Sequence, residues 1–326
     1  MATASVSVVI PTWNRADLLR NALLSLGRQT IAPAEILVVD NASTDDTPQV
    51  VRESRAGLIS LESNVGFAGA VNEGVRRAAS EWIFILNNDV ELQADWIACA
   101  LSSAERLNVD FVTGKLMQAH APERIDGTWD LVSRAGCAWR CGWNSLDGVR
   151  WSEARRVRIA SLTATMFRRR VFEKVGPLDT VYESYYEDVD FGIRCAMKHV
   201  EGLYEPRAKG IHLGSATLHG SDRVTYLVAR NQVLLAKKFR LAEMSRWKVA
   251  LGQSAALLPA IRRRHLLAAL RGKLDGWRLA KTVSAAEFDC SELDAFLKNQ
   301  EAELANEQSK SGFDLSWRLY FSLCGR

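Results

Sequence analysis

The first third of the chain alternates short apolar runs with helical segments, and this alternation limits the folds open to it. The apolar runs, rich in Val, Ile and Leu, cover residues 5–12, 35–40, 57–63 and 82–86. After each run, apolar side chains recur with a helical spacing or follow helix-capping residues. Short connections between alternating strands and helices produce a parallel, doubly wound sheet with flanking helices. The sequence therefore predicts a large α/β domain.

Polar or small residues follow each of the four predicted strands. The carboxyl ends of parallel strands meet at one edge of a sheet, where ligands bind. Four such groups in succession favour a binding site over four unrelated turns. The residues are Pro11, Thr12, Trp13, Asn14 and Arg15 after the first strand, Asp40 and Asn41 after the second, Asn64, Gly66, Phe67 and Ala68 after the third, and Asn87, Asn88 and Asp89 after the fourth.

The polar side chains in these groups suit a nucleotide. Asp40 can accept hydrogen bonds from a base or a ribose. Three amides, those of Asn14, Asn41 and Asn64, can pair with the edge of a uracil-like or thymine-like base. The pattern predicts a nucleotide-binding edge.

Other residues at this edge point to phosphate and to close approach of a ligand. Arg15, with the helix start behind it, favours anionic phosphates. Gly66 and Gly69 let the backbone approach a flat or bulky group. Trp13 either packs against a base or is a partly buried spacer. Neither a G-x-G-x-x-G fingerprint nor a Walker loop follows the first strand, so the expected nucleotide site has another design.

Four segments carry a resemblance to a known family. They are VSVVIPTWNRADLLRNALLSLGRQT, ILVVDNASTDDT, NVGFAGAVNEGVRRA and FILNNDVEL. In this order they resemble the family 2 inverting glycosyltransferases of the GT-A fold, and in particular rhamnosyltransferase-like bacterial members that build surface polysaccharides. The resemblance continues through YYEDVDFGIRCAMKHV and PRAKGIHLGSAT and covers roughly residues 5 to 235. It implies a Rossmann-like sheet, a nucleotide-sugar donor and a hydroxyl acceptor.

The resemblance also implies a metal site. The NND run occupies the place of the family's D-x-D motif, whose last carboxylate holds a divalent ion against the donor diphosphate. Asp89 is the expected ligand for Mg²⁺ or Mn²⁺, and His212 is expected to join the metal or the diphosphate. Asn87 replaces the first aspartate of the motif, so its amide oxygen would face the ribose or a metal-bound water.

The acidic run of YYEDVDFG supplies the expected catalytic groups. By resemblance, Asp188 is the general base that takes the proton from the acceptor hydroxyl, and Glu187 orients the acceptor or the helix. Asp190 is equally well explained as a helix cap. The resemblance places Asn72 and Arg230 at the donor site as well, although Arg230 could instead pair with an acid on the sheet.

The character of the chain changes near its C-terminal third. We expect a GT-A catalytic domain over residues 1–238, with a nucleotide-sugar half (1–115) and an acceptor half (116–238), and a helical region over 239–326. The helical region is basic and rich in Leu and Trp residues. It could lie on an anionic membrane surface, form a solvated subdomain, or make a homodimer contact. Nucleic acid is not expected, because no recognised motif accompanies the charge.

The predicted function is transfer of a sugar with inversion, in surface polysaccharide biosynthesis. dTDP-L-rhamnose is the favoured donor and a UDP-hexose the second choice; the acceptor is a glycan or a lipid-linked saccharide. The alternatives are a phosphohydrolase using Asp89 and a non-catalytic nucleotide-sugar-binding protein. The N-terminus shows no secretory signal, and no apolar run could span a bilayer. We therefore expect a cytoplasmic protein, peripheral on the inner face of the membrane.

Overall fold

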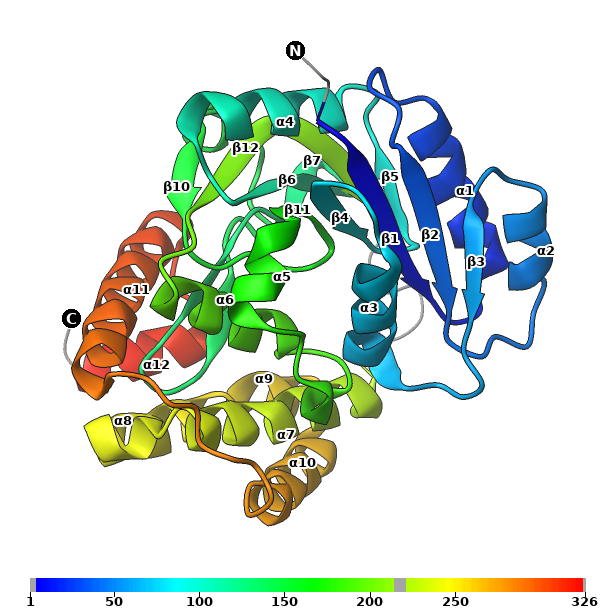
Figure 1. The fold of residues 1–326 in the computed structure, drawn as a ribbon. Helices are drawn as coiled ribbons and strands as arrows, with labels where there is room; N and C mark the ends of the chain where they lie inside the picture. The colour runs from blue at the N-terminus through cyan, green and yellow to red at the C-terminus, as the bar shows by residue number, and fades with distance from the viewer. Residues whose placement is uncertain (1–3, 214–220, 325–326) are drawn as a thin grey trace. The chain divides into compact units, whose positions relative to one another are not determined.

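The computed structural model describes residues 4–213 and 221–324, which form two compact units (Figure 1). The first unit consists of Met1–Trp129 and Gly142–Ala216, and the second of Asp130–Cys141 and Thr217–Arg326. The chain therefore enters the second unit twice. The expected boundary between a catalytic domain and a helical region after residue 238 stays a prediction.

A single sheet runs through the first unit. In spatial order its main path is β10 (Arg155–Val157), β12 (Gly202–His212), β6 (Phe111–Gln118), β11 (Ala164–Arg168), β4 (Trp82–Leu86), β1 (Val6–Thr12), β2 (Glu35–Asp40) and β3 (Gly57–Ser60). Two further strands leave this path: β5 (Val90–Leu92) pairs with β12, and β7 (Ala121–Gly127) pairs with β6. Within the described residues β1, β2, β3, β4, β6 and β12 point the same way. The predicted mostly parallel sheet is confirmed.

The predicted helices are also confirmed. The first unit contains α1 (Ala16–Gly27), α2 (Thr47–Arg52), α3 (Gly66–Arg77), α4 (Trp96–Leu107), α5 (Arg169–Val175) and α6 (Glu187–Met197).

Two details of the strands differ from expectation. The third strand ends at Ser60 rather than at residue 63, because after the bond from Leu61 N to Asp40 O the chain bends away. The short strand β5 follows the NND run, and sequence reasoning did not predict it.

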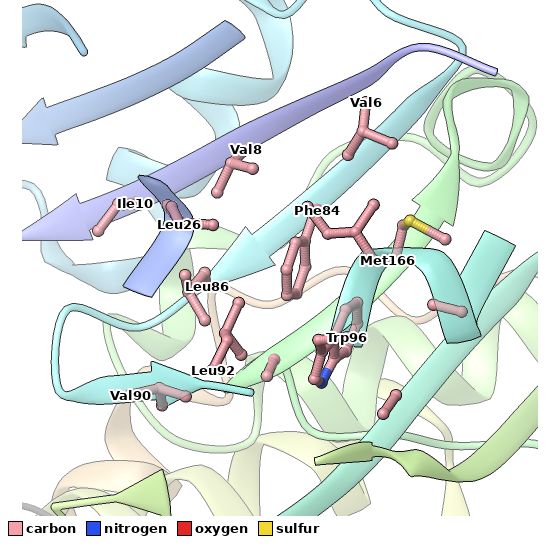
Figure 2. Packing of buried hydrophobic residues seen from close by; sticks show 14 of the residues in the cluster. Val6, Val8, Ile10, Leu26, Phe84, Leu86, Val90, Leu92, Trp96 and Met166 are labelled. Atoms are coloured by element: carbon pink, nitrogen blue, oxygen red, sulfur yellow. The ribbon is translucent and has the colours of Figure 1, made fainter. Parts of the chain in front are cut away.

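The core of the first unit supports the carboxyl edge of the sheet. Val6, Val8 and Ile10 project from one face of β1 toward side chains of β4 and α4 (Figure 2). Phe84 and Trp96 stack with ring centroids 4.1 Å apart, and both are fully buried. Burial of one such aromatic side chain stabilises the fold by about 2–3 kcal/mol. The loops at the ends of these strands are thus attached to a rigid layer.

The second unit is helical apart from a small hairpin, β8 (Asp130–Val132) with β9 (Ala138–Arg140). Its helices are α7 (Asp222–Lys238), α8 (Leu241–Ala255), α9 (Leu258–Arg262), α10 (Leu266–Leu279), α11 (Cys290–Ser311) and α12 (Leu315–Cys324). The predicted C-terminal helical region is therefore confirmed. Among the described residues, no helix combines the length and the apolar character needed to cross a membrane.

Candidate active site

The loop after β1 adopts an unusual backbone conformation. Asn14 and Arg15 both have a positive φ, 59° and 62°, which costs side-chain-bearing residues about 1 kcal/mol or more each. Two hydrogen bonds fix this loop to the one after β2: Asn14 N donates to Ser43 Oγ (2.7 Å), and Thr44 N donates to Asn14 Oδ1 (2.8 Å). Such over-determined strain is typical of functional loops.

Arg15 is the cation of this loop. A hydrogen bond to Asp17, with 3.0 Å between Nη2 and Oδ2, raises the pKa of the Arg15 guanidinium, and the charge of Asp89 adds to the effect. The negative charge of Asp89, in the NND turn, therefore acts on the Arg15 guanidinium. Trp13, two residues earlier, is half exposed, and Pro11 and Thr12 are buried at the end of β1.

The residues after β2 and β3 connect loops to each other. Asp40 is buried, and its Oδ1 accepts from Ser43 N at 2.9 Å. Asn41 Oδ1 accepts from Val65 N (2.8 Å), while its Nδ2 donates to Asn64 Oδ1 and to Gly66 O (3.1 Å each). Both ends of the Asn41 amide thus bond within the protein. These bonds join the loops after β2 and β3, and the expected contact of the Asn41 amide with a base stays a prediction.

The start of α3 is attached to the segment that precedes α6. Gly66 has a φ of +78°, and a Cβ there would lie 2.8 Å from Glu183 O. Ala68 N donates to the same oxygen at 3.2 Å. Asn72 exchanges two hydrogen bonds of 2.8 Å with the backbone of Leu178. Asn72 and Ala68 therefore hold the acidic segment at this edge, and Phe67, which precedes Ala68, is partly buried.

The NND turn contains two buried oxygens without hydrogen bonds. Asn87 N donates to Thr163 O at 2.9 Å, and Asn88 Nδ2 donates to Thr12 Oγ1 at 2.8 Å. By contrast, Asn87 Oδ1 and Asp89 Oδ1 have no hydrogen-bond partner among the residues that the structure describes. A buried oxygen without a hydrogen bond is costly, and Asp89 Oδ1 has only the ion-pair contact with His212 Nε2, at 3.3 Å, to offset its charge. These two oxygens are suited to a hard cation or to a ligand hydroxyl.

Strand pairing brings His212 beside this turn. In the antiparallel pair of β12 and β5, His212 is opposite Val90, the residue after Asp89. His212 Nε2 lies 3.3 Å from Asp89 Oδ1, and Nδ1 lies 2.7 Å from Asp126 Oδ2. Burial acts to lower the pKa of His212, but the hydrogen bond to Asp126 and the charge of Asp89 together raise it to about 9. The expected neighbours Asp89 and His212 do meet.

Asp126 is a site residue that sequence reasoning missed. It is buried on β7, which pairs with β6, while β6 pairs with β12 on its other side. A carboxylate on the far ring nitrogen fixes the orientation of a histidine, as in many metal sites. No local motif marks Asp126, because its position beside His212 depends on the pairing of β6 and β7 with β12, and His212 lies 86 residues away in sequence.

The acidic residues of α6 divide into two roles. Asp190 is fully buried; it pairs with Arg194 at 2.8 Å and accepts from Tyr182 Oη at 3.3 Å. It therefore holds the helix in place. Asp188 is only partly buried, and its Oδ1 accepts from Val189 N at 2.8 Å. Glu187 is buried beside it.

The backbone before α6 is strained in the same way as the loop after β1. Glu183, Tyr185 and Tyr186 have φ values of 61°, 67° and 75°. Glu183 O is the atom that accepts from Ala68 N, so this strained segment lies against the start of α3. Because α3 begins at the carboxyl edge of the sheet, the start of α6 lies at that edge as well.

Contacts on the other side of α6 lead to the NND turn. A Cβ on Gly192 of α6 would lie 2.6 Å from Ile159, which shows how closely the helix packs there. Four residues further, Thr163 O accepts the bond from Asn87 N. The segment from Ile159 to Thr163 therefore contacts both α6, whose first turn carries Asp188, and the turn that carries Asp89. The roles assigned to these two aspartates stay predictions.

Arg230 belongs to the second unit. It is buried on α7, and its Nε donates to Asn231 Oδ1 at 2.9 Å. The assignment of Arg230 to the donor site stays a prediction. Among residues 4–213 and 221–324, no group of three or more His, Cys, Asp and Glu side chains forms a metal cage. A site for Mg²⁺ or Mn²⁺ needs no such cage, since these ions keep water and substrate phosphates as ligands.

Comparisons with known proteins agree with this geometry. The chain is 28% identical over 257 residues, 71% of its length and 82% of the relative's, to an N-acetylglucosaminyl-diphospho-decaprenol L-rhamnosyltransferase of Mycobacterium tuberculosis. It is 30% identical over 202 residues, 60% of its length and 71% of the relative's, to a PGL/p-HBAD biosynthesis glycosyltransferase of Mycobacterium bovis.

Two solved structures share the fold. One is GalNAc-T7 with UDP, GalNAc and Mn²⁺, with a TM-score of 0.64 at 14% identity; the match covers 96% of this chain and 58% of that one. The other is the mannosyltransferase PcManGT of Pyrobaculum calidifontis with GDP-Man and Mn²⁺, with a TM-score of 0.54 at 21% identity over 94% and 87%. Both support the GT-A fold. The model of glycosyl transferase family 2 matches residues 7–176, more than half of the chain, so the chain belongs to glycosyl transferase family 2.

Proposed function

We propose that this glycosyltransferase moves L-rhamnose from dTDP-L-rhamnose to a hydroxyl of a glycan or lipid-linked saccharide, with inversion at the anomeric carbon. The observation that carries the proposal is the pair of unbonded oxygens on Asn87 and Asp89, beside His212 and at the same edge as Arg15. The rhamnosyltransferase relative supports the donor sugar. A UDP-hexose is the second candidate donor.

The residues at this edge suit a divalent ion, Mg²⁺ or Mn²⁺. Asp89 and His212 would hold it, with the amide oxygen of Asn87 facing the ribose or a water of the ion. Structural neighbours that contain Mn²⁺ support this choice. When bound, the ion supplies positive charge against the leaving diphosphate. His212 could equally contact the diphosphate itself, since its imidazolium form is favoured next to two carboxylates.

The chemical step is assigned to α6. Asp188 accepts the proton of the acceptor hydroxyl while that oxygen forms a bond to the anomeric carbon. The bond from this carbon to the diphosphate oxygen breaks on the opposite side, so the configuration inverts. General base catalysis of this kind contributes about 10²–10⁴-fold. Glu187, buried at the first turn of the helix, orients the acceptor or Asp188.

The biological setting follows from the relatives. One is named as an L-rhamnosyltransferase of N-acetylglucosaminyl-diphospho-decaprenol, and another as a PGL/p-HBAD biosynthesis glycosyltransferase. We assign this chain to polysaccharide biosynthesis on the cytoplasmic face of a membrane, with the basic C-terminal helices as a peripheral contact. A homodimer through the same helices is the competing arrangement.

A thermal-shift screen of nucleotide sugars, with and without Mn²⁺, tests the proposal. A donor present at about 100 times its dissociation constant should stabilise the protein by about 2.7 kcal/mol. We expect the largest shift with dTDP-L-rhamnose and Mn²⁺, and a rhamnosylated product of inverted configuration by NMR. Release of free phosphate without any acceptor would support a phosphohydrolase instead. Donor binding without turnover of any acceptor would support a binding protein.

A further inference from the structure

Helix α10 turns its smallest residues toward the protein. Gly272 and Gly276 contact α7 so closely that a Cβ on them would lie 2.3 Å from Tyr226 O and 2.7 Å from Arg230 O. Ala269, on the same side of the helix, is buried. No bulkier residue fits on this side, so α10 packs backbone to backbone against α7.

The large apolar side chains of α10 face the opposite way. Leu267 is 83% exposed and Trp277 69% exposed, and Leu270 and Leu274 between them are exposed as well. At 3.6 residues per turn these four lie within an arc of about 80° on the helix surface. We refer to Leu267, Leu270, Leu274 and Trp277 as the α10 apolar face. An ordinary surface helix buries such a stripe, and a continuous exposed one marks an interaction surface.

Positive charge surrounds this face. Arg271 and Arg278 lie directly beside it on the helix, and their side chains are 81% and 77% exposed. Exposed basic residues also flank the helix at both ends: Arg262, Arg263 and Arg264 before it and Lys281 after it. Between residues 258 and 281 the single acidic residue is Asp275, whose carboxylate is paired with Arg278 at 2.9 Å. The face is therefore apolar with a basic rim.

We propose that the α10 apolar face docks on the surface of an anionic lipid bilayer. Trp277 and the three leucines enter the boundary between headgroups and acyl chains, and the arginines of the rim bind lipid phosphates. A second copy of the chain fits less well, because a symmetric contact would bring two sets of these arginines together. The inference rests on the helix alone, and it gives the proposed transferase a position next to a lipid-linked acceptor.

Flotation of the full chain with vesicles tests this inference. We expect the protein to float with vesicles that contain phosphatidylglycerol and to remain unbound with phosphatidylcholine alone. The double variant Leu274→Ser/Trp277→Ser should lose the binding. In Arg271→Gln/Arg278→Gln the binding should weaken by roughly fivefold for each arginine removed. The matched control is Leu315→Ser/Leu323→Ser on α12, which removes two exposed leucines outside the basic stretch and should float like the parent.

Two results would overturn the inference. In the first, the Leu274/Trp277 variant floats as well as the parent. In the second, the parent is a dimer by light scattering and this variant a monomer, which would make the face a subunit contact. The arginine variant keeps the test valid if the apolar variant fails to fold, since its two side chains are solvated. Donor-induced thermal shifts should be the same in all of these variants, so failure of flotation alone removes the membrane contact and leaves the proposed sugar transfer intact.

Discussion

The carboxyl edge of the sheet and the outer face of α10 break the ordinary rule of burial in opposite directions. At the sheet edge, Asn87 Oδ1 is buried without a hydrogen bond, and Asp89 Oδ1 is buried with only an ion-pair contact to His212. On α10, Leu267 and Trp277 are exposed although glycines fill the buried side. Both arrangements are unfavourable in isolation, and each is relieved by a ligand of matching chemistry. The first predicts a cation with a diphosphate, and the second predicts a lipid surface.

The largest effect is expected from Asp188→Asn. Removal of the general base should lower kcat about 10²–10⁴-fold, while the donor-induced thermal shift stays unchanged. The measurement is single-turnover transfer to a saccharide acceptor together with donor titration. Near-parental turnover of the Asp188→Asn enzyme would show that the general base does not lie on α6 at this position.

Asp190→Asn is the matched change two residues away, and we expect it to act on stability. Asp190 is fully buried and paired with Arg194, so its neutralisation leaves a cation without its partner. Breaking a pair of this kind costs about 3 kcal/mol or more. Denaturant unfolding measures this loss. If Asp190→Asn instead kept full stability and lost turnover, the roles assigned to the two aspartates would have to be exchanged.

Asp126→Asn should weaken binding at the sheet edge. Asp126 orients His212 through a 2.7 Å contact to Nδ1. Loss of such a supporting carboxylate reduces metal affinity by about 10–100-fold. Calorimetric titration of Mn²⁺ in the presence of donor measures the change. Asp147→Asn, a change to a carboxylate paired with Lys115, is the control and should leave Mn²⁺ affinity unaltered.

The last prediction concerns Lys273, on α10, and the pH dependence of stability. Burial lowers its pKa to about 8, and its Nζ donates to Gln232 Oε1 at 2.7 Å. Between about pH 8 and the unfolded value near 10.4 the unfolded chain holds more protons, so this residue makes the free energy of unfolding rise with pH. Below about pH 8 the buried, protonated Lys273 destabilises the folded state by its full amount. Each unit by which the pKa is lowered corresponds to about 1.4 kcal/mol.

The check is denaturant unfolding of Lys273→Met at about pH 7 and about pH 10. The variant should lose this part of the pH dependence, whereas Lys281→Met, at an exposed position, should keep it. An identical slope in parent and Lys273→Met would show that the ammonium group is solvated.

Local patterns were enough to predict the strands and helices of the first half, and the family resemblance was needed to expect His212 near Asp89. They could not predict β5 or Asp126, because the pairing of β5, β12, β6 and β7 joins segments far apart in sequence. The bonds of Asn41 and Asn72 to other loops could not be predicted either, because an isolated amide in a sequence does not show which backbone groups it will meet. Likewise, the spacing of leucines in α10 is the same whether the face is buried or exposed. Only the close contacts of Gly272 and Gly276 with α7 show which side of α10 is buried.

The most direct test of the central claim is a crystal structure with dTDP-L-rhamnose, in which anomalous scattering locates Mn²⁺. The account predicts a manganese peak on Asp89 Oδ1 next to His212, with the diphosphate on the ion and the anomeric carbon facing Asp188. Manganese bound elsewhere, or a sugar directed away from α6, would contradict it.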